Sequence, residues 1–217
     1  MTTVDTVSTA TRRSARFWDR IAERYAKKPV ADEASYQRKL RITRSYLRPD
    51  MELLEFGCGT GSTALALAPD VARITAIDIS SKMVGIARRK AESSGVANVA
   101  FLRAAIDDFE APTGGFDSVL GMSILHLLED RDAVVAKVHG LLKPGGVFVT
   151  STACIGDFMR SFKLIAPVGR FLGVLPLVKV FTAVDLENSL KEQGFRIAER
   201  WQPGKGKSVF IVAVKAS

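Results

Sequence analysis

The sequence predicts one α/β domain with a doubly wound, seven-stranded sheet that is mostly parallel and ends in an antiparallel hairpin. Short strand-like runs alternate with helical runs from Met51 onward, a pattern typical of a parallel sheet with helices on both faces. The last two strands are joined by a loop too short for a crossover, so they must be antiparallel. With 217 residues and 47% hydrophobic content, the chain can bury one substantial core.

The N-terminal part, residues 13–48, is expected to form a helical cap on this domain. Apolar residues recur at helical spacing from Arg13 to Lys27, and a second helix is expected from Ala34 to Leu47. Residues 1–12 are small and polar and lack the apolar core of a secretory signal. We therefore expect a disordered leader, a cytoplasmic location and a single domain over residues 13–217.

The elements of the sheet follow in alternation, each bounded by turn-forming residues. We expect helices at Gly61–Ala68, Ser81–Ser94, Asp130–Leu142 and Val184–Gln193. We expect strands at Glu52–Phe56, Ala72–Ile79, Val99–Arg103, Phe116–Met122, Val147–Ala153, Phe195–Trp201 and Ser208–Val214. Residues 155–181 form an insertion before the last helix, at the carboxyl ends of the strands, where ligands bind in open α/β sheets.

The strongest single motif is the run ELLEFGCGTG at residues 52–61, an apolar strand followed by three glycines at alternate positions. Glycine permits positive φ and lets a ligand approach the main chain closely. Asp78 ends the next strand, where an acidic side chain can accept hydrogen bonds from both hydroxyls of a ribose. Asp78 could instead cap the following helix, although Ser80 is better placed for that task. The two features predict a nucleotide-type cofactor.

Further motifs occur in order after the glycine loop: AIDIS followed by SKMVGIARRKA, then FDSVLGMSILHLLED, then LLKPGGVFVT. Together with the glycine loop they resemble the successive motifs of the class I S-adenosylmethionine-dependent methyltransferases, in the quinone-biosynthesis-like branch. The resemblance covers residues 51–152 and the terminal hairpin. It implies a Rossmann-like fold, S-adenosylmethionine as the cofactor and a methyltransferase activity.

The resemblance also implies which residues hold each part of the cofactor. The methionine part is expected near Glu55, Gly57, Gly59 and Gly61, the ribose at Asp78, and the adenine against Ile79, Met83, Ala105 and Ile106. The family often has an acidic residue where Ala105 stands, and here only Asp107 or Asp108 could replace it. Met122 and Ser123 are expected near the sulfonium and the acceptor.

Two residues are candidates for a catalytic role. Tyr25, by analogy with the N-terminal tyrosine of this branch, is expected to close over the cofactor. His126 follows the fourth strand, where it could position or deprotonate the acceptor. It could equally be a hydrogen-bonded residue packed against the next helix. Because a sulfonium methyl is already activated, proximity and exclusion of water can account for much of the catalysis.

Charge is concentrated in the N-terminal segment. Residues 11–48 contain twelve basic and four acidic residues, a net charge of +8 that equals the charge of the whole chain. Such a segment is either a solvated helix face or a site of attraction for an anionic partner such as a phospholipid surface. The two cysteines and two histidines do not form a ligand set with zinc spacing, so no metal is expected.

The insertion at residues 155–181 combines four phenylalanines with scattered lysines and arginines, and charges and prolines interrupt it too often for a membrane-spanning helix. It is either a lid that buries these side chains in the core, or a segment that binds a hydrophobic acceptor or contacts a membrane surface. We expect methyl transfer to a small, hydrophobic or lipid-like acceptor. The protein would then be cytoplasmic, with residues 12–48 and 155–181 available to an anionic membrane surface.

Three other functions share some of these sequence features. A nicotinamide oxidoreductase is disfavoured because no tyrosine is followed four residues later by a lysine. A nucleic-acid methyltransferase, acting on RNA for example, fits the basic charge but lacks the Asn- or Asp-Pro-Pro-aromatic sequence after the fourth strand. A non-catalytic S-adenosylmethionine-binding protein remains an alternative, because the motifs indicate binding without proving turnover.

Overall fold

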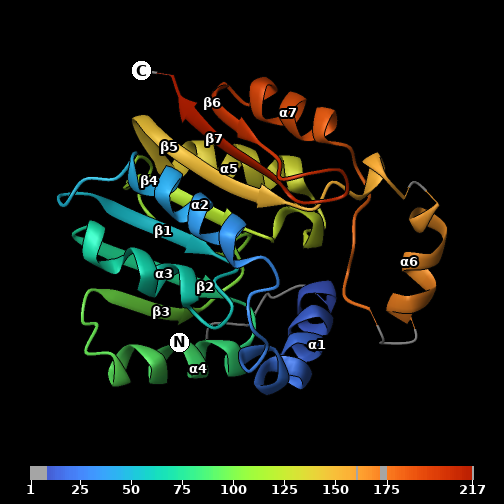
Figure 1. The fold of residues 1–217 in the computed structure, drawn as a ribbon, viewed down its shortest axis with the longest axis horizontal. Helices are drawn as coiled ribbons and strands as arrows, with labels where there is room; N and C mark the ends of the chain where they lie inside the picture. Colours follow the sequence, from blue (N-terminus) through green and yellow to red (C-terminus); the bar gives the residue numbers. More distant parts are fainter. Residues whose placement is uncertain (1–8, 160, 172–174, 217) are drawn as a thin grey trace, which may run out of the picture.

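The computed structural model describes residues 9–159, 161–171 and 175–216, which fold around a seven-stranded sheet in the order β3-β2-β1-β4-β5-β7-β6 (Figure 1). Adjacent strands from β3 to β5 pair in parallel, and β7 pairs antiparallel with both β5 and β6. The strands are β1 Glu52–Phe56, β2 Arg73–Asp78, β3 Val99–Arg103, β4 Phe116–Met122, β5 Leu142–Thr152, β6 Phe195–Trp201 and β7 Val209–Lys215. The predicted fold class is confirmed.

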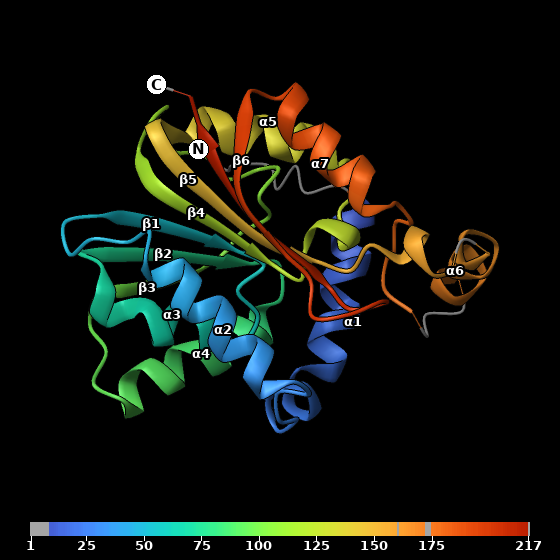
Figure 2. The same cartoon turned by 45° about the horizontal axis from the view of Figure 1, so that its top comes forward.

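Helices cover both faces of the sheet, as Figure 2 shows. One apolar core lies between the sheet and helices α5 and α7, and a second lies between the sheet and α2, α3 and α4. The helices are α1 Thr9–Ala26, α2 Glu33–Arg44, α3 Ser62–Leu67, α4 Ser81–Ser93, α5 Arg131–Leu141, α6 Phe162–Phe171 and α7 Ala183–Glu192. Short 3-10 turns lie at η1 Ala68–Asp70, η2 Leu125–Leu127 and η3 Ile155–Asp157.

Side-chain caps explain where four of the helices begin. The oxygen of the residue before each helix accepts a hydrogen bond from a backbone N–H in the first turn, which satisfies a donor that has no partner inside the helix. The capping residues are Asp32, Ser80, Asp130 and Thr182. Ser80 caps α4, so the alternative in which Asp78 is the cap is wrong.

Three predicted boundaries differ by three residues or more, and the first is the end of α2, at Arg44 rather than Leu47. Helix α1 includes Thr9 to Arg12, which the sequence assigned to a disordered leader. Small polar residues lower helix propensity only modestly, and this stretch has no glycine or proline to stop the helix. Residues 1–8 of the expected leader lie outside the described residues. Strand β5 begins at Leu142 rather than Val147, because Leu142 pairs with Phe116 before an irregularity in the register.

The carboxyl ends of the parallel strands point toward α1 and α6 (Figure 1). Helix α6 belongs to the insertion at residues 155–181 and stands away from the sheet, while Leu177 and Phe181 of the same insertion are buried. Phe181 packs into the core beside α5 and α7, whereas Phe158 is 44% exposed. Part of the insertion is therefore core, and part is open to solvent.

Candidate active site

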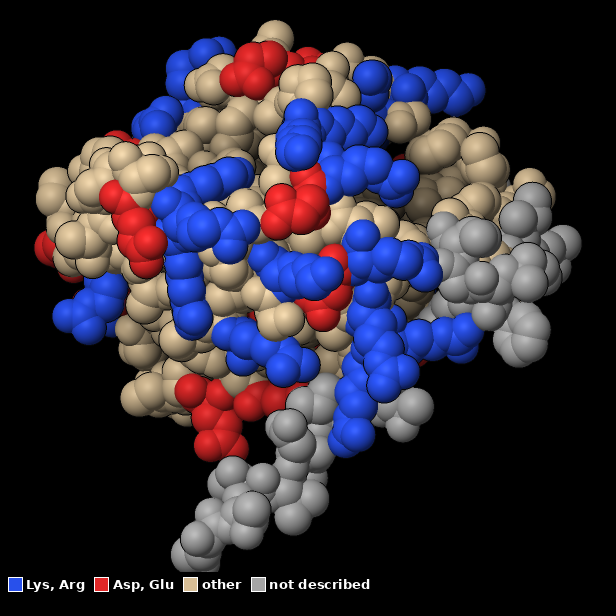
Figure 3. All heavy atoms as spheres, turned by 90° about the horizontal axis from the view of Figure 1, so that it is seen from below, with Lys and Arg blue, Asp and Glu red and all other residues tan. Residues whose placement is uncertain are grey.

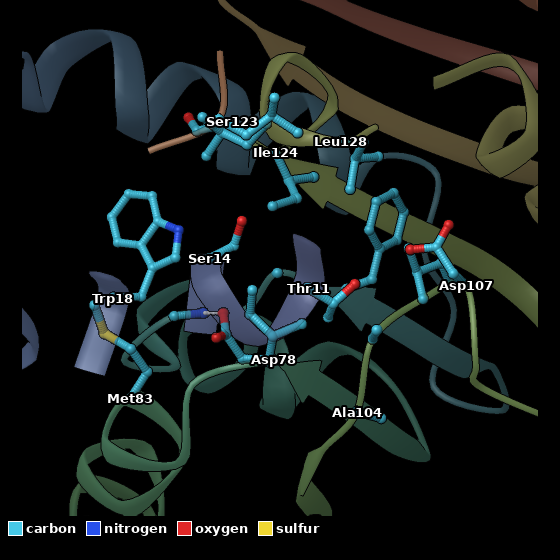
Figure 4. A pocket seen from close by; sticks show the side chains of 18 of the residues that line it. Thr11, Ser14, Trp18, Asp78, Met83, Ala104, Asp107, Ser123, Ile124 and Leu128 are labelled. Carbon is cyan, nitrogen blue, oxygen red and sulfur yellow. Dashed lines mark hydrogen bonds between the residues drawn. The ribbon is translucent and has the colours of Figure 1, made fainter. Parts of the chain in front are cut away.

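A cavity opens at the carboxyl edge of the sheet, and its lining comes from segments far apart in the sequence (Figure 4). It encloses about 950 Å³ including its open mouth. Its walls are α1, the loops after β1, β2, β3 and β4, and one residue of the insertion. The lining residues are Thr11, Ser14, Trp18, Tyr25, Phe56, Gly57, Gly59, Asp78, Ile79, Met83, Ala104, Ala105, Ile106, Asp107, Met122, Ser123, Ile124, Leu127, Leu128, Glu129 and Leu177.

The three glycines after β1 adopt positive φ, at +65° for Gly57, +54° for Gly59 and +77° for Gly61. A Cβ at Gly57 would lie 2.6 Å from Ile124, and one at Gly61 would lie 2.8 Å from Ala87. A Cβ at Gly59 would meet nothing within 4 Å. Gly59 thus presents bare backbone to the cavity. Gly61 does not line the cavity, and it serves the close packing of the loop against α4.

Asp78 lies at the end of β2 with its side chain in the cavity wall, where it is 9% exposed. Its Oδ2 accepts a hydrogen bond from the Gly59 N–H and its Oδ1 accepts one from the Ser80 N–H, both at 2.9 Å. Burial raises the pKa of Asp78, these two hydrogen bonds oppose the rise, and the Asp19 carboxylate adds to it. The carboxyl group is therefore held between the glycine loop and α4, with lone pairs left to accept from a ligand.

Glu55 lies behind the glycine loop on β1 and does not line the cavity. Its side chain is buried, and its Oε2 has no hydrogen-bond partner among the residues that the structure describes. Burial raises the pKa of Glu55 to about 8, a backbone hydrogen bond from Ala64 opposes the rise, and the charge of Asp78 adds to it. At neutral pH the group is mainly protonated, so it is a neutral hydrogen-bond donor beneath the loop.

The residues predicted to hold the adenine converge on the cavity. Ile79, Met83, Ala105 and Ile106 all line it, and Trp18 lies beside Met83 in Figure 4. The lining of the cavity also distinguishes the two acidic candidates that the sequence left open, because it includes Asp107 and not Asp108. Burial raises the pKa of Asp107, and Asp108 adds to the rise.

Beyond the glycine loop most of the cavity lining is apolar, and Ser123 and Glu129 are the polar residues there. Met122, Ile124, Leu127, Leu128 and Leu177 line this part, with Ser123 among them. Ser123 has φ of +57°, and it is the one non-glycine residue with positive φ in the part of the chain that the structure describes. Its N–H donates to the Ser151 carbonyl at 2.7 Å, which holds the turn after β4. Backbone strain of this kind tends to occur at functional sites.

Helix α1 covers the cavity with one of its faces. Thr11, Ser14, Trp18 and Tyr25 recur at helical spacing and all line the cavity. Tyr25 is 49% exposed, its ring centroid lies 6.2 Å from that of Trp18, and partial burial together with the charge of Asp78 raises its pKa. The phenol therefore stays protonated. The sequence identified Tyr25 but missed the other three, although their spacing from Tyr25 was a usable signal.

His126 lies in η2 and does not line the cavity. Burial lowers its pKa to about 4, so the imidazole is neutral at neutral pH, and its Nδ1 has no hydrogen-bond partner among the described residues. Its carbonyl accepts a hydrogen bond from the Lys179 N–H at 2.8 Å, which ties the insertion to this turn. His126 thus lies outside the cavity lining, and its Nδ1 lacks the hydrogen bond that the packing interpretation expected.

Metal sites and membrane-spanning helices can be searched for only among the residues that the structure describes. Within them, no group of three or more His, Cys, Asp or Glu side chains is arranged to hold a metal ion. None of the helices in residues 9–159, 161–171 and 175–216 has the length and hydropathy needed to cross a bilayer. Cys58 and Cys154 are free and buried.

Comparisons with known proteins agree with this geometry. Residues 53–146 match a family described as a methyltransferase domain. The ubiquinone biosynthesis O-methyltransferase of Aromatoleum aromaticum is 31% identical over 194 residues, which are 85% of this chain and 79% of that protein. The enzyme of the same name from Methylocella silvestris is 30% identical over 63% of this chain and 58% of its own length, so the chain spans less than two thirds of that relative.

Solved structures agree on the fold. An S-adenosylmethionine-dependent methyltransferase from Mesorhizobium loti superposes with a TM-score of 0.67, at 20% identity over 81% of this chain and 95% of that one. At this identity the likeness concerns the arrangement of helices and strands.

Proposed function

Because the chain belongs to the class I S-adenosylmethionine-dependent methyltransferases, in the quinone-biosynthesis-like branch, we propose that it transfers a methyl group to a small, hydrophobic or lipid-like acceptor. S-adenosylmethionine is the cofactor that this membership implies. The observation that carries the proposal is the continuity of the cavity, in which the glycine loop and Asp78 share one space with an apolar wall that includes Leu128 and Leu177.

The residues present fit the cofactor. Gly59 offers bare backbone where a Cβ would find open space, so a ligand can lie directly against the loop. Asp78 is fixed by two backbone N–H groups and keeps acceptor capacity for the ribose hydroxyls. Ile79 and Met83 give an apolar surface for the adenine, and Asp107 supplies a nearby acceptor for its amino group. Glu55 is a buried carboxyl group with an unused oxygen beneath the methionine end.

When bound, the cofactor supplies a methyl group on a positively charged sulfur that is already activated for in-line displacement. The chain then has to hold an acceptor in line and keep water out. Trp18 and Tyr25 cover the cavity from α1, while Leu177 and Leu128 exclude water from the far end. No charged base is needed for this chemistry, and His126 lies outside the cavity lining. We assign His126 to packing and Tyr25 to closure over the cofactor.

The apolar part of the cavity favours a hydrophobic acceptor. Ile124, Leu127, Leu128 and Leu177 contribute aliphatic side chains, and a hydrophobic group gains free energy by leaving water for such a surface. The relatives from Aromatoleum aromaticum and Methylocella silvestris are named for ubiquinone biosynthesis, which agrees with a lipid-like acceptor.

The partner surface that we propose is an anionic membrane, reached from the cytoplasm by peripheral contact. Lys and Arg side chains gather over the face formed by α1 and α4, with acidic groups scattered among them (Figure 3). Three of the four basic residues of α2 have partners within the chain: Lys39 donates to Ser151 at 2.8 Å, Arg44 pairs with Asp70 at 2.9 Å and Arg38 lies 4.4 Å from the centre of the Trp201 ring. The fourth, Arg41, is exposed. The membrane contact within residues 12–48 is therefore assigned to α1, with the exposed Phe158 and Met159 adding apolar contact from residues 155–181.

The experiment that tests the function follows a labelled methyl group from S-adenosylmethionine into an extract of host cells. The products are separated into organic, small aqueous and macromolecular fractions. We expect label in the organic fraction. Label in the small aqueous fraction would contradict a lipid-like acceptor, and label on RNA would favour the nucleic-acid alternative. Cofactor binding without any transfer would indicate a binding protein.

The matched control for this experiment is Asp78→Ala. The substitution removes the carboxylate that faces the ribose and leaves the Gly59 and Ser80 N–H groups without their acceptor. Loss of hydrogen bonds to a charged group costs about 1.5–3 kcal/mol each. Cofactor affinity should therefore fall about tenfold or more by calorimetry, and transfer should fall with it. Unchanged affinity would contradict the ribose assignment.

A further inference from the structure

We propose that Asp19 is a positioning residue for the cofactor, which latches α1 over the cavity and at the same time fixes the segment that orients Asp78. The proposal rests on the proposed function, because the ligand it concerns is S-adenosylmethionine. Asp19 does not line the cavity and has no contact with the expected cofactor position. It acts through Ser80, the residue between the ribose-binding strand and helix α4.

The Asp19 carboxylate gathers donors from the first turn of α4. Its Oδ1 accepts hydrogen bonds from the Ser80 hydroxyl at 2.6 Å, the Lys82 N–H at 3.0 Å and the Ser81 hydroxyl at 3.4 Å. The Lys82 N–H is one of the donors that the helix itself cannot satisfy. Ser80 in turn accepts from the Met83 N–H at 3.1 Å as the cap of α4. Asp19 therefore completes the capping of α4 from a different helix.

The same hydrogen-bond chain continues into the cavity wall. The Ser80 N–H donates to Oδ1 of Asp78, and the Gly59 N–H donates to Oδ2 of the same carboxylate. Helix α1, the start of α4, the end of β2 and the glycine loop are thus joined through Asp19, Ser80 and Asp78. When Asp19 is bound, Ser80 is held in the position that aims the Asp78 carboxylate.

Charge strengthens this latch. Partial burial acts to raise the pKa of Asp19, but hydrogen bonds from Ser80, Lys82 and Ser81 outweigh it and hold the pKa below its ordinary value. The group is therefore ionised at neutral pH, and a negative charge is favourable at the N-terminal end of a helix dipole. Charge-assisted hydrogen bonds of this kind are roughly twice as strong as neutral ones.

The other attachments of α1 to α4 are modest. A small apolar cluster joins Ala22 of α1 to Met83 and Ile86 of α4. Glu23 and Arg89 form an ion pair of 3.5 Å in which both side chains are largely exposed, and such pairs contribute little. Helix α1 also covers the cavity, and the three hydrogen bonds that Asp19 accepts hold this helix against the first turn of α4.

The test measures binding of S-adenosylhomocysteine, the product, so it needs no acceptor. We compare Asp19→Ala and Asp19→Asn with Glu23→Gln, which removes the exposed ion pair between the same two helices. Trp18 reports closure by fluorescence in a Trp201→Phe background, because the chain has two tryptophans and Trp18 lines the cavity. Calorimetry gives the affinity, and stopped-flow fluorescence gives the rate constants.

We expect Asp19→Ala to bind about tenfold or more weakly, with the loss in the dissociation rate, since a latch stabilises the closed state. Asp19→Asn keeps the acceptor oxygen without the charge and should lose less. Glu23→Gln should stay within about twofold of wild type. If Asp19→Ala fails to fold, the isosteric Asp19→Asn variant provides the test, and we still expect it to release S-adenosylhomocysteine faster than wild type.

An affinity of Asp19→Ala within about twofold of wild type would overturn the latch and leave the proposed function standing. A weaker affinity with an unchanged dissociation rate would overturn the latch, because Asp19 would then only fix the segment that orients Asp78. Absence of binding by the wild-type chain would overturn the latch and the proposed function together.

Discussion

Two carboxyl groups on neighbouring strands show how individual residues divide the work of the site. Asp78 receives hydrogen bonds from two backbone N–H groups, which favour its charged form. Glu55 lies deeper and has an oxygen without a partner among the described residues, and burial raises its pKa to about 8. Burial favours the neutral form of both groups, and two backbone donors oppose it at Asp78 against one at Glu55.

This difference predicts how Glu55 affects stability. Its pKa in the folded protein, about 8, lies above its ordinary value of 4.5, so its ionisation opposes folding. The protonated carboxyl group contributes its full stability to the folded protein below about pH 4.5, where it is protonated in both states. This contribution to the free energy of unfolding is lost as the pH rises through about 8. Glu55→Gln, which cannot ionise, should therefore become increasingly more stable than wild type over this range. Urea denaturation at a series of pH values measures the difference in the free energy of unfolding.

The control for this prediction is Glu52→Gln, at the other end of the same strand, where the carboxylate lies 3.8 Å from Arg73. This partly exposed pair should give no comparable divergence with pH. If the unfolding free energies of Glu55→Gln and wild type ran parallel from acid to alkaline pH, the carboxyl group would not be the buried neutral acid inferred here.

At the scale of elements, α1 has faces with different tasks. Trp18 and Tyr25 lie on the face toward the cavity, and Asp19 and Ala22 contact α4. Arg12, Arg13, Arg16, Arg20, Arg24, Lys27 and Lys28, on α1 and the two residues after it, are all exposed, and at helical spacing they fall on the remaining face. One helix thus has a face that covers the cofactor site and, next to it, a cationic face.

The cationic face predicts binding to anionic vesicles. Arg16→Gln with Arg24→Gln should weaken binding to phosphatidylserine-containing vesicles by about 2 kcal/mol, because each basic residue near an anionic surface contributes about 1 kcal/mol. Cosedimentation at low and high salt measures the effect, and it should shrink at high salt.

The matched control removes two exposed basic residues from α7 and β6, Lys191→Gln with Arg196→Gln, and leaves α1 intact. Equal losses in the two double variants would mean that net charge alone matters. No loss in the α1 variant would leave this face as a solvated surface without a membrane partner.

At the scale of the whole molecule, stability comes from the two cores on either side of the sheet. Leu120 of β4 is fully buried in the core beside α2, α3 and α4, at the centre of the strand order. Leu102 of β3 is 42% exposed at the edge of the sheet. Two leucine side chains of one sheet therefore have very different exposure to solvent.

Leu120→Ala should lower the free energy of unfolding by about 2–5 kcal/mol, since it removes buried methyl groups and leaves a cavity. Leu102→Ala should change it by about 0.5 kcal/mol or less. Chemical denaturation of both variants measures this contrast. Similar losses at the two positions would contradict the burial that the sheet order produces.

The sequence by itself determined the strands of the sheet, most of the helices and the family of the site, but it did not predict helix α6. Period-two and helical patterns are local, so strands such as Glu52–Phe56 and Phe116–Met122 were predicted with the observed bounds. The glycine loop and Asp78 were also readable, because turn chemistry and strand ends depend on near neighbours. The first residues of α1 and β5 were predicted less well. Propensities at the ends of elements are weak, so tertiary contacts decide where an element begins.

Only the tertiary structure decided which residues meet. It brought Leu177 and Ser14 to the same cavity as Gly59, since long-range packing has no signature in local periodicity. It placed His126 outside that cavity, although the residue follows β4 closely, because the η2 turn directs the side chain into a buried position. It also joined Asp19 to Ser80, 61 residues away along the chain. Such contacts depend on how the helices pack against the sheet. Burial and hydrogen-bond geometry determine this packing only when the whole chain has folded.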